Sequence, residues 1–419
     1  MIDVCSSTRT RGLWVLSAAL LCSCPQPLPS PPRRRPARAG TPERMLPLPA
    51  DLVKSKEHFQ FLIFGDSRAG HSRCDKPRKH SCDIVLPGGA IPTREDCSLE
   101  ERAPELMLEA ITERLTARAP PTGPRDAFAL FTGDLVFRGS CKKDWELVRA
   151  KLLSRIPARR LYPIVGNHES WHGRNEPRPL PFFFQAYPHL RLHVGDKKIE
   201  PHYYFFHLGR SLFINLCTGG YPRFGAPADF EKADRRWLCE VAPFPRQMAW
   251  LDKVLAYGAR HGVRHVFVQY HKPSFSCSRH PSLDDRHDPM FHLRPFKKRH
   301  PEVNIIALSG HNHTTALYVS EGVVSLVAGG SGAPQHTEWG ARACHPHKRQ
   351  PPERFWNGAR RVTRYNYFRV VVHGNQLTIG ERCLTRVNGR FEYRPGAVIS
   401  ANGTVTHRTG ACRLHSTTP

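Results

Sequence analysis

The chain has 419 residues, and 40% of them are hydrophobic, which suits a globular protein with a large core and excludes a wholly disordered chain. Lys and Arg outnumber Asp and Glu by 62 − 36 = 26 residues. A surplus this large favours anionic partners such as phosphorylated substrates, nucleic acid or an acidic envelope surface. A genome-wide preference for arginine over lysine is the alternative explanation.

Residues 1–24 are predicted to be an export signal. Two arginines precede the apolar stretch 13–21, which is too short to anchor a protein across a bilayer. The sequence Leu21-Cys22-Ser23-Cys24 then resembles a bacterial lipobox with Cys24 as the lipidated residue, and ordinary signal cleavage is the alternative. We therefore expect export to the periplasm or cell envelope with a lipid anchor at Cys24, or otherwise secretion.

The remaining chain divides by composition. Residues 25–54 are rich in Pro and Arg and are predicted to form a disordered tether, because they cannot bury enough apolar surface to fold. A domain is predicted at 55–385, with polar insertions at 71–98 and 335–361, and residues 386–419 remain as a C-terminal extension. No stretch after the leader reaches about 18 consecutive apolar residues, the length expected of a membrane-spanning helix.

Strands and helices alternate in the first half of the domain. Apolar runs at 59–64, 128–131 and 161–165 predict strands, and apolar residues at helical spacing predict helices at 107–115 and 145–156. This alternation indicates an α/β sheet.

The same pattern returns in the second half. A helix is predicted at 247–259, followed by strands at 263–270 and 303–308. Further strand patterns suggest a second sheet, and they lie at 203–216, 323–328, 367–372 and 376–379. The predicted fold class is therefore α/β, with two packed mixed β-sheets flanked by helices.

Ten cysteines lie outside the leader, and an even number in an exported protein suggests disulfide bonds. Scattered buried thiols are the alternative, and none of the ten forms the paired CxxC pattern of a zinc site. These cysteines are Cys74, Cys82, Cys97, Cys141, Cys217, Cys239, Cys277, Cys344, Cys383 and Cys412.

Five short polar motifs each follow an apolar strand pattern. They are Gly65-Asp66-Ser67-Arg68, Gly133-Asp134-Leu135, Gly166-Asn167-His168-Glu169, His271-Lys272-Pro273 and Gly310-His311-Asn312-His313. Ligands of α/β sheets bind beyond the carboxyl ends of the strands, so the five motifs are predicted to converge on one rim. Carboxylate, imidazole and amide groups together suit Zn, Fe or Mn, and two such ions can activate water against a phosphate ester.

In type and order, these motifs resemble the calcineurin-like metallophosphoesterase superfamily, and the chain is most similar to its purple-acid-phosphatase-like branch. The sequence Gln247-Met248-Ala249-Trp250-Leu251 resembles a helix start of that branch, and Gly329-Gly330-Ser331-Gly332-Ala333-Pro334 resembles its glycine-rich stretch. The resemblance covers roughly residues 57–380. It implies a four-layer sandwich and a phosphoric ester hydrolase.

The resemblance also implies a role for each motif residue. Two divalent or trivalent ions of Fe, Mn or Zn would be the cofactors, and a bridging hydroxide would attack the phosphorus atom of a phosphate ester. The implied roles are Asp66 and His313 on the first ion, Asp134 bridging both ions, Asn167, His271 and His311 on the second ion, His168 contacting the substrate to protonate or orient the leaving group, and Glu169 in a supporting place.

Two positions depart from the family pattern. Many members carry a metal-binding histidine where this chain has Arg68, and purple acid phosphatases carry a tyrosine where it has Phe137. Arginine has no free lone pair for a cation. The first ion would then be completed by water or substrate, or by another residue such as His71. Arg68 itself could clamp a phosphate oxygen, and this interpretation beside a water-completed first ion is favoured over a surface salt bridge.

Other functions remain open from the sequence. A phosphate- or polyanion-binding protein with an eroded first metal site is one alternative, and an extracytoplasmic phosphodiesterase or nuclease is another. No helix-turn-helix or zinc finger is found, so sequence-specific nucleic acid binding is not expected. With Phe137 in place of tyrosine, an iron-loaded protein is predicted to lack the tyrosinate colour. Four histidines between the last two motifs are expected to be solvated, namely His280, His287, His292 and His300.

Overall fold

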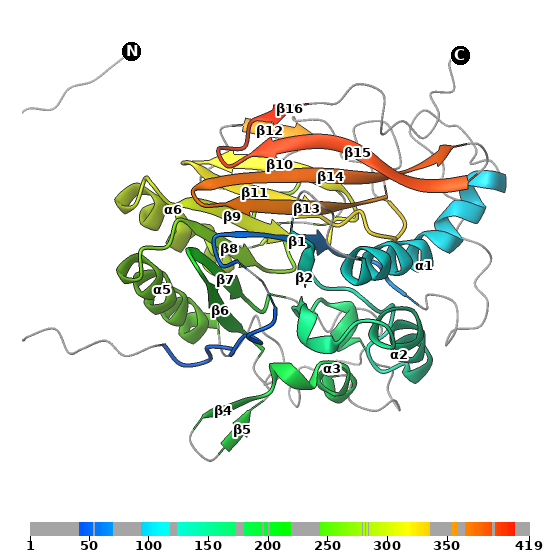
Figure 1. Cartoon of the computed structure of the whole chain (residues 1–419), viewed down its shortest axis with the longest axis horizontal. Coiled ribbons are helices and arrows are strands. Elements are labelled where there is room, and N and C mark those ends of the chain that lie inside the picture. Colours follow the sequence, from blue (N-terminus) through cyan, green and yellow to red (C-terminus); the bar gives the residue numbers. More distant parts are fainter. Residues whose placement is uncertain are drawn as a thin grey trace, which may run out of the picture. The chain divides into compact units, whose positions relative to one another are not determined.

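The computed structural model (Figure 1) describes most of the predicted domain. The described residues are 42–52, 55–69, 94–117, 124–171, 180–194, 197–199, 202–218, 244–278, 280, 282–283, 285–335, 354–357, 365–387 and 390–406. The predicted leader, most of the tether and His71 lie outside them. Among the described helices, none combines the length and hydropathy needed to cross a membrane.

The first sheet has seven strands in the order β16-β15-β14-β13-β1-β2-β3. Strand β1 pairs in parallel with β2 and antiparallel with β13, so the sheet is mixed. The strands are β1 (His58–Phe64), β2 (Asp126–Phe131), β3 (Leu161–Pro163), β13 (Asn366–His373), β14 (Gln376–Val387), β15 (Arg390–Ser400) and β16 (Val405–Thr406).

The second sheet also has seven strands, in the order β12-β10-β11-β9-β8-β7-β6. Its centre, from β7 through β8 and β9 to β11, is parallel, and its outer strands pair antiparallel. The strands are β6 (Tyr204–Leu208), β7 (Ser211–Asn215), β8 (His265–Gln269), β9 (Asn304–Ser309), β10 (Thr315–Ser320), β11 (Val323–Ala328) and β12 (Arg354–Asn357).

Aromatic side chains join the two sheets. The ring centroid of Phe61 on β1 lies 5.3 Å from that of Phe213 on β7 and 5.1 Å from that of Phe267 on β8. Phe128 on β2 also meets Phe213, at 5.4 Å. Edge-to-face pairs of this kind add to the burial of large apolar surface. The sheets therefore pack face to face, and the continuous apolar run of each central strand reflects burial on both sides.

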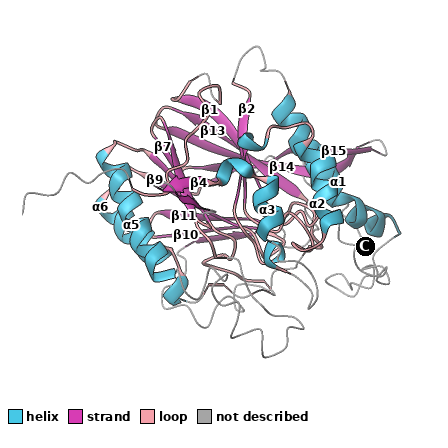
Figure 2. Cartoon of the chain, turned by 90° about the horizontal axis from the view of Figure 1, so that it is seen from below, coloured by secondary structure: helices cyan, strands magenta, loops and turns pink. Residues whose placement is uncertain are grey.

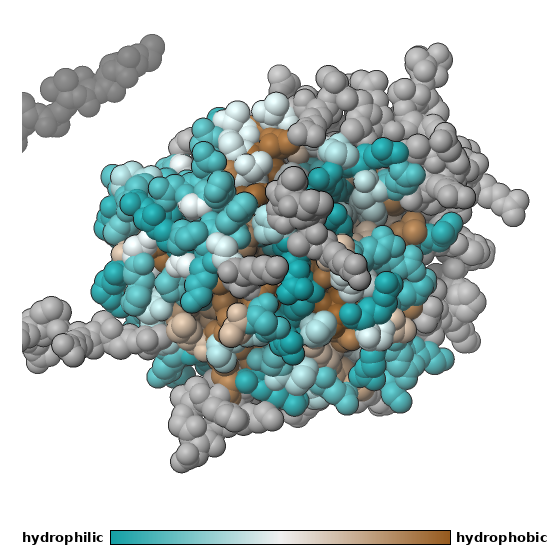
Figure 3. Space-filling view, in the orientation of Figure 1, coloured by the Kyte–Doolittle hydropathy of each residue, from teal (hydrophilic) through white to brown (hydrophobic). Residues whose placement is uncertain are grey.

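Helices cover the two outer faces (Figure 2). Helices α1 (Arg94–Thr116), α2 (Lys142–Val148) and α3 (Leu180–Ala186) gather on one side, while α5 (Phe244–Arg260) and α6 (Met290–Arg299) lie together on the other. Helix α1 contacts β2, α5 contacts β7, and α6 contacts β9 and β11. Figure 3 shows mostly hydrophilic residues over the outer side of α5 and α6. The predicted fold class is confirmed. A small hairpin of β4 (Leu192–Val194) and β5 (Lys197–Ile199) stands apart.

The membership of the sheets differs from the prediction. The patterns at 367–372 and 376–379 form β13 and β14, which lie in the first sheet beside β1 and not in the second. A periodic pattern identifies a strand but not its partner, so this assignment was wrong. The predicted helix at 145–156 changes at Arg149 into a π-helical turn, Arg149–Leu153.

The described domain is also longer than predicted at both ends. Leu46 and Leu52, within the predicted tether, are buried in the core, and the Leu46 amide donates to the Phe205 carbonyl at 2.7 Å. At the other end, β15 and β16 extend the first sheet beyond residue 385. The two predicted insertions lie mostly outside the described residues, although the start of α1 and strand β12 fall within them.

Four of the ten cysteines outside the leader are buried in the described part of the chain, namely Cys141, Cys217, Cys277 and Cys383. No pairing scheme for the ten follows from the described residues.

Candidate metal centre

The five predicted motifs lie at the carboxyl ends of five strands. Asp66 follows β1, Asp134 follows β2 and Asn167 follows β3 in the first sheet, while His271 follows β8 and His311 follows β9 in the second. Because the sheets pack against each other, these ends come together at one edge of the sandwich.

The backbone at this edge is strained. Asp66, Arg68, Asp134, His311 and His313 have φ values of 57°, 47°, 61°, 69° and 42°. These are five of the seven non-glycine residues with positive φ in the described part of the chain. The left-handed region is disfavoured for residues with a Cβ atom, and each such residue costs about 1–3 kcal/mol. The strain at these five positions lowers the stability of the fold. It indicates that the backbone is held in this conformation because the conformation places the side chains of the site.

Two glycines make room for the carboxylates. A Cβ atom on Gly166 would overlap the carboxylate of Asp134, and one on Gly310 would overlap that of Asp66. The glycines of these motifs are therefore required by close approach, since any side chain would displace a candidate ligand.

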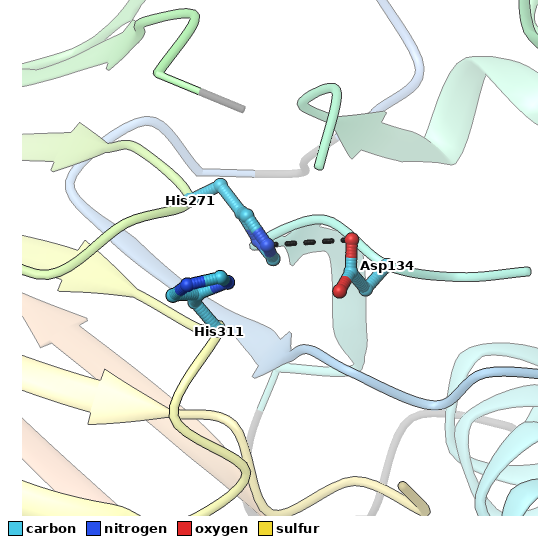
Figure 4. Close-up of side chains that lie close together, drawn as sticks. All are labelled: Asp134, His271 and His311. Atoms are coloured by element: carbon cyan, nitrogen blue, oxygen red, sulfur yellow. Dashed lines mark ion pairs between the residues drawn. The ribbon is translucent and has the colours of Figure 1, made fainter. Parts of the chain in front are cut away.

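Four residues from four loops form what we call the second half-site: Asp134, Asn167, His271 and His311. The Oδ1 atom of Asn167 lies 2.9 Å from Nε2 of His271 and 2.9 Å from Nδ1 of His311. Nε2 of His271 lies 3.3 Å from Oδ1 of Asp134. Figure 4 marks this ion pair with a dashed line. Ligand atoms about 2.0–2.1 Å from one ion lie about 2.9–3.4 Å apart, so these donors have the spacing of a single coordination shell.

Three residues form what we call the first half-site: Asp66, Asp134 and His313. Their ligand atoms lie within 4.8 Å of one another, and Nε2 of His313 is 3.8 Å from Oδ1 of Asp66. Within the described residues, Oδ1 of Asp66 and Oδ2 of Asp134 are buried and have no hydrogen-bond donor. A buried carboxylate oxygen without a partner is costly, and a cation would satisfy both atoms. The residues therefore fit a metal ion.

Carbonyl groups orient two of the histidines. Nδ1 of His271 donates to the Thr132 carbonyl at 2.8 Å, and Nδ1 of His313 donates to the Pro334 carbonyl at 2.8 Å. When the ring is neutral, a proton fixed on Nδ1 leaves the lone pair of Nε2 directed at the half-sites, which is how metal-binding histidines are commonly held.

Glu169 supports the loop that carries Asp134. Its carboxylate accepts hydrogen bonds from the amides of Asp134 (2.8 Å), Leu135 (2.7 Å), Val136 (3.3 Å) and Gly166 (2.7 Å). All four hydrogen bonds are made to backbone amides of the two loops.

The two aspartates have opposite electrostatic environments. Burial opposes ionisation of Asp134, but the adjacent His271 and other cations outweigh burial and lower its pKa. In return, the carboxylate of Asp134 overcomes the effect of burial on His271 and raises its pKa to about 9. Burial dominates at Asp66 and raises its pKa well above the ordinary value. The charge of the centre is therefore concentrated on the Asp134–His271 pair.

Arg68 faces the centre. Its guanidinium lies 3.8 Å from Oδ2 of Asp134, its side chain is only 15% exposed, and its Nε atom is buried with no acceptor among the described residues. The predicted alternative of a surface salt bridge is therefore wrong. The side chain points into the candidate centre and retains an unused donor.

His168 lies beside Arg68. Its Nδ1 atom donates to the Phe137 carbonyl at 2.5 Å, and its Nε2 atom is 3.8 Å from Oδ2 of Asp134. Burial, together with the positive charge of Arg68, lowers the pKa of His168 to about 3. A neutral ring with its proton on Nδ1 presents a lone pair to the site, so Nε2 must take up a proton before it can donate to the oxygen of a leaving group.

One neighbour of the centre differs from the sequence prediction. The ring centroid of His280, expected to be solvated, lies 4.6 Å from that of His311 and 5.8 Å from that of His313. Its position between two motifs was the only sequence signal. The carbonyls of Thr132 and Pro334 were missed as well, because any residue type can supply a backbone carbonyl.

The family profile described as calcineurin-like phosphoesterase matches residues 106–315, half of the chain. The chain belongs to this family. Four of the five motifs lie wholly within the match, and the first motif precedes it. No curated protein matches the chain.

Solved structures give weaker similarities. A purple acid phosphatase, PPD1 of yellow lupin (Lupinus luteus), is 14% identical with a TM-score of 0.46, over 80% of this chain and 53% of the lupin chain, about half its length. GAP50, described as the anchor in the inner membrane complex of Plasmodium, is 13% identical with a TM-score of 0.41, over 81% of this chain and 88% of that one. A putative 5'-nucleotidase from Staphylococcus aureus is 12% identical with a TM-score of 0.35, over 82% and 54%. Similarities this low say nothing about activity.

Proposed function

We propose that this protein hydrolyses phosphate esters at a centre of two metal ions drawn from Fe, Mn and Zn. The observation that carries the proposal is the pair of buried donor clusters that share Asp134. When bound, two such ions would hold the phosphoryl oxygens, supply hydroxide and stabilise the leaving oxygen. Carboxylate, imidazole and amide donors suit all three metals.

The two oxygens of Asp134 support a bridging role. Oδ1 is turned toward His271 in the second half-site, and Oδ2 remains on the side of Arg68, without a hydrogen-bond donor among the described residues. One carboxylate can thus serve both half-sites without moving. The proposed ligands are Asp66, Asp134 and His313 for the first ion and Asp134, Asn167, His271 and His311 for the second.

Arg68 and His168 are the proposed substrate contacts. Arg68 keeps an unused, buried Nε donor at the edge of the centre, and a guanidinium binds phosphate oxygens through parallel hydrogen bonds. His168 is held by the Phe137 carbonyl and would orient the leaving group through Nε2. The net charge of +26 would draw anionic esters toward the protein.

The test combines metal analysis with turnover. The stripped chain is reconstituted with Mn, Fe or Zn, metal content per chain is measured, and hydrolysis of p-nitrophenyl phosphate and its bis ester is followed. Metal-dependent release of nitrophenol is the expected result, and the preferred ester separates a monoesterase from a phosphodiesterase or nuclease. Metal-free protein that binds polyanions without turnover would instead establish the alternative of a binding protein with an eroded site.

We also propose that the protein is exported and lipid-anchored at Cys24, with secretion as the alternative. The basic and apolar pattern of residues 1–24 and the lipobox-like sequence support this proposal. Metabolic labelling with a radioactive fatty acid is expected to mark the wild type and not Cys24→Ala. Unlabelled wild-type protein in the culture medium would support secretion, and retention in the cytoplasm would refute export.

A further inference from the structure

The two half-sites differ in how many donors they contain. The second half-site has four donors from side chains, and Nε2 of His271 already lies 2.9 Å from the Asn167 donor and 3.3 Å from the Asp134 donor. The first half-site has three donors within the described residues. The two positions where relatives place a further ligand hold Arg68 and Phe137, neither of which can bind a cation.

Arg68 also places a fixed positive charge at the first half-site. Its guanidinium is 3.8 Å from Oδ2 of Asp134, the oxygen not engaged with His271. A cation entering the first half-site would use the same oxygen and would be repelled by the guanidinium in a buried, weakly screened environment. Incomplete ligation and repulsion both weaken binding there.

Arg68 cannot leave the site by a simple backbone shift. Its amide donates to the Asp134 carbonyl at 3.0 Å, and the next amide, of Ala69, donates to the Leu135 carbonyl at 2.8 Å. The φ of 47° further fixes this turn. The backbone that carries the guanidinium is therefore held beside the first half-site, and Nε is buried without an acceptor among the described residues.

An oxyanion would remove both weaknesses. One oxygen supplies the missing ligand, and another accepts from the unused donor of Arg68, so the negative charge offsets the repulsion. Building on the proposed function, we propose that the second half-site holds its ion alone, whereas the first half-site holds an ion only together with a phosphate group. Binding of the first-site ion and binding of phosphate are then coupled, and each must strengthen the other by the same factor.

The coupling can be measured without turnover. Free Mn²⁺ is counted by electron paramagnetic resonance while the metal-stripped full chain is titrated, with and without inorganic phosphate. We expect one ion per chain without phosphate and two with it, the weaker ion gaining about 5–150-fold in affinity. Two equally tight ions without phosphate, or one ion under both conditions, would overturn the inference.

Variants of Arg68 test the cause. Arg68→His restores a ligand and removes the fixed charge, so two ions should bind without phosphate. Arg68→Met removes only the charge and donors, so the phosphate effect should shrink below about 5-fold. The matched control is Arg299→His, an exposed arginine at the end of α6, which should keep the wild-type phosphate effect. An unchanged phosphate effect in both Arg68 variants would exclude Arg68 as the cause.

These outcomes separate the inference from the proposed function. Two tight ions without phosphate, accompanied by hydrolysis, would leave the proposed function intact and refute only the coupling. No ion bound under either condition would refute both.

Discussion

The two half-sites share Asp134 but differ in how closely their donor atoms already match the spacing of a coordination shell. In the second, donors from both sheets already have the spacing of one coordination shell, with Asn167 2.9 Å from two histidines. In the first, Nε2 of His313 remains 3.8 Å from Asp66, and Arg68 lies beside the shared carboxylate. The charges differ in the same way, since Asp134 has a cationic partner in His271 while burial keeps the pKa of Asp66 high. The donors of a single metal centre can therefore be preorganised in one half-site and not in the other.

Removing ligands of the second half-site should have the largest effect on metal binding and hydrolysis. In the double variant Asn167→Ala, His271→Ala, the second half-site keeps only Asp134 and His311, which is too few donors for a tight ion. We expect bound metal to fall below one ion per chain and hydrolysis to fall to background, at least about 1,000-fold, with the fold retained. Elemental analysis and turnover check this. His300→Ala, at the end of α6, is the control and should change neither. Persistent hydrolysis by the metal-stripped variant would contradict the proposed mechanism.

The substrate side of the centre is tested by His168→Gln. Glutamine keeps a polar group but cannot reproduce an imidazole with Nδ1 held by the Phe137 carbonyl and Nε2 directed at the site. We expect kcat to fall about 100–10,000-fold while the metal content stays at the wild-type level. Steady-state kinetics with parallel metal analysis makes the measurement. Loss of metal along with activity would show that His168 holds the centre together and does not act on the substrate.

The scaffold under the shared carboxylate is tested by Glu169→Gln. Four backbone amides donate to the two carboxylate oxygens, and a glutamine amide would place a donor against some of them. Burial raises the pKa of Glu169 to about 7, and the amides favour its ionised form. We expect a loss of about 2–4 kcal/mol in the free energy of unfolding, since buried amides lose their acceptor. Denaturant titration of metal-free protein measures it. A loss confined to metal affinity, with stability unchanged, would count against this explanation.

The difference between the half-sites was only partly predictable from the sequence. Asp66, Asp134 and His271 could be assigned because each follows an apolar strand, and strand ends in such sheets share an edge. An inward-facing Arg68 was the favoured interpretation of the sequence, but a surface salt bridge stayed open because the sequence does not give the φ of 47° at this turn. The packing of His280 against His311 also depends on how a loop folds back.

The same limit applied to the sheets. The local pattern at 59–64 identified β1, and the pattern at 367–372 identified β13. Neither pattern showed that these two strands pair. Strand pairing depends on contacts between residues far apart in sequence, and an antiparallel neighbour leaves no local signature. The candidate site residues were easier to single out from the sequence than the sheet order, because they are marked by their chemistry.

The last and smallest predicted effect is the loss of folding stability in acid that is caused by His189, a histidine outside the two half-sites. Acid protonates metal ligands, and it also destabilises the fold by protonating histidines that are buried in the neutral form. A histidine outside the metal centre is therefore needed to measure the second effect separately. His189 donates through Nε2 to the Leu161 carbonyl at 2.9 Å, and its Nδ1 is buried without a partner among the described residues. Burial lowers the pKa of His189 to about 4. A proton added to Nδ1 would find no acceptor.

The sign of the effect follows from proton binding. Between about pH 6.5 and 4 the unfolded chain binds a proton at His189 that the folded chain does not, so stability is complete above about pH 6.5 and declines toward pH 4. His189→Gln keeps a donor for the Leu161 carbonyl and cannot titrate. From pH 7 to pH 5 in the presence of a chelator, we expect wild type to lose up to about 2 kcal/mol more than this variant. Urea unfolding at the two pH values measures the difference. Equal losses would mean that His189 is already protonated in the fold, and acid sensitivity would then have to come from other buried groups, including the metal-free half-sites.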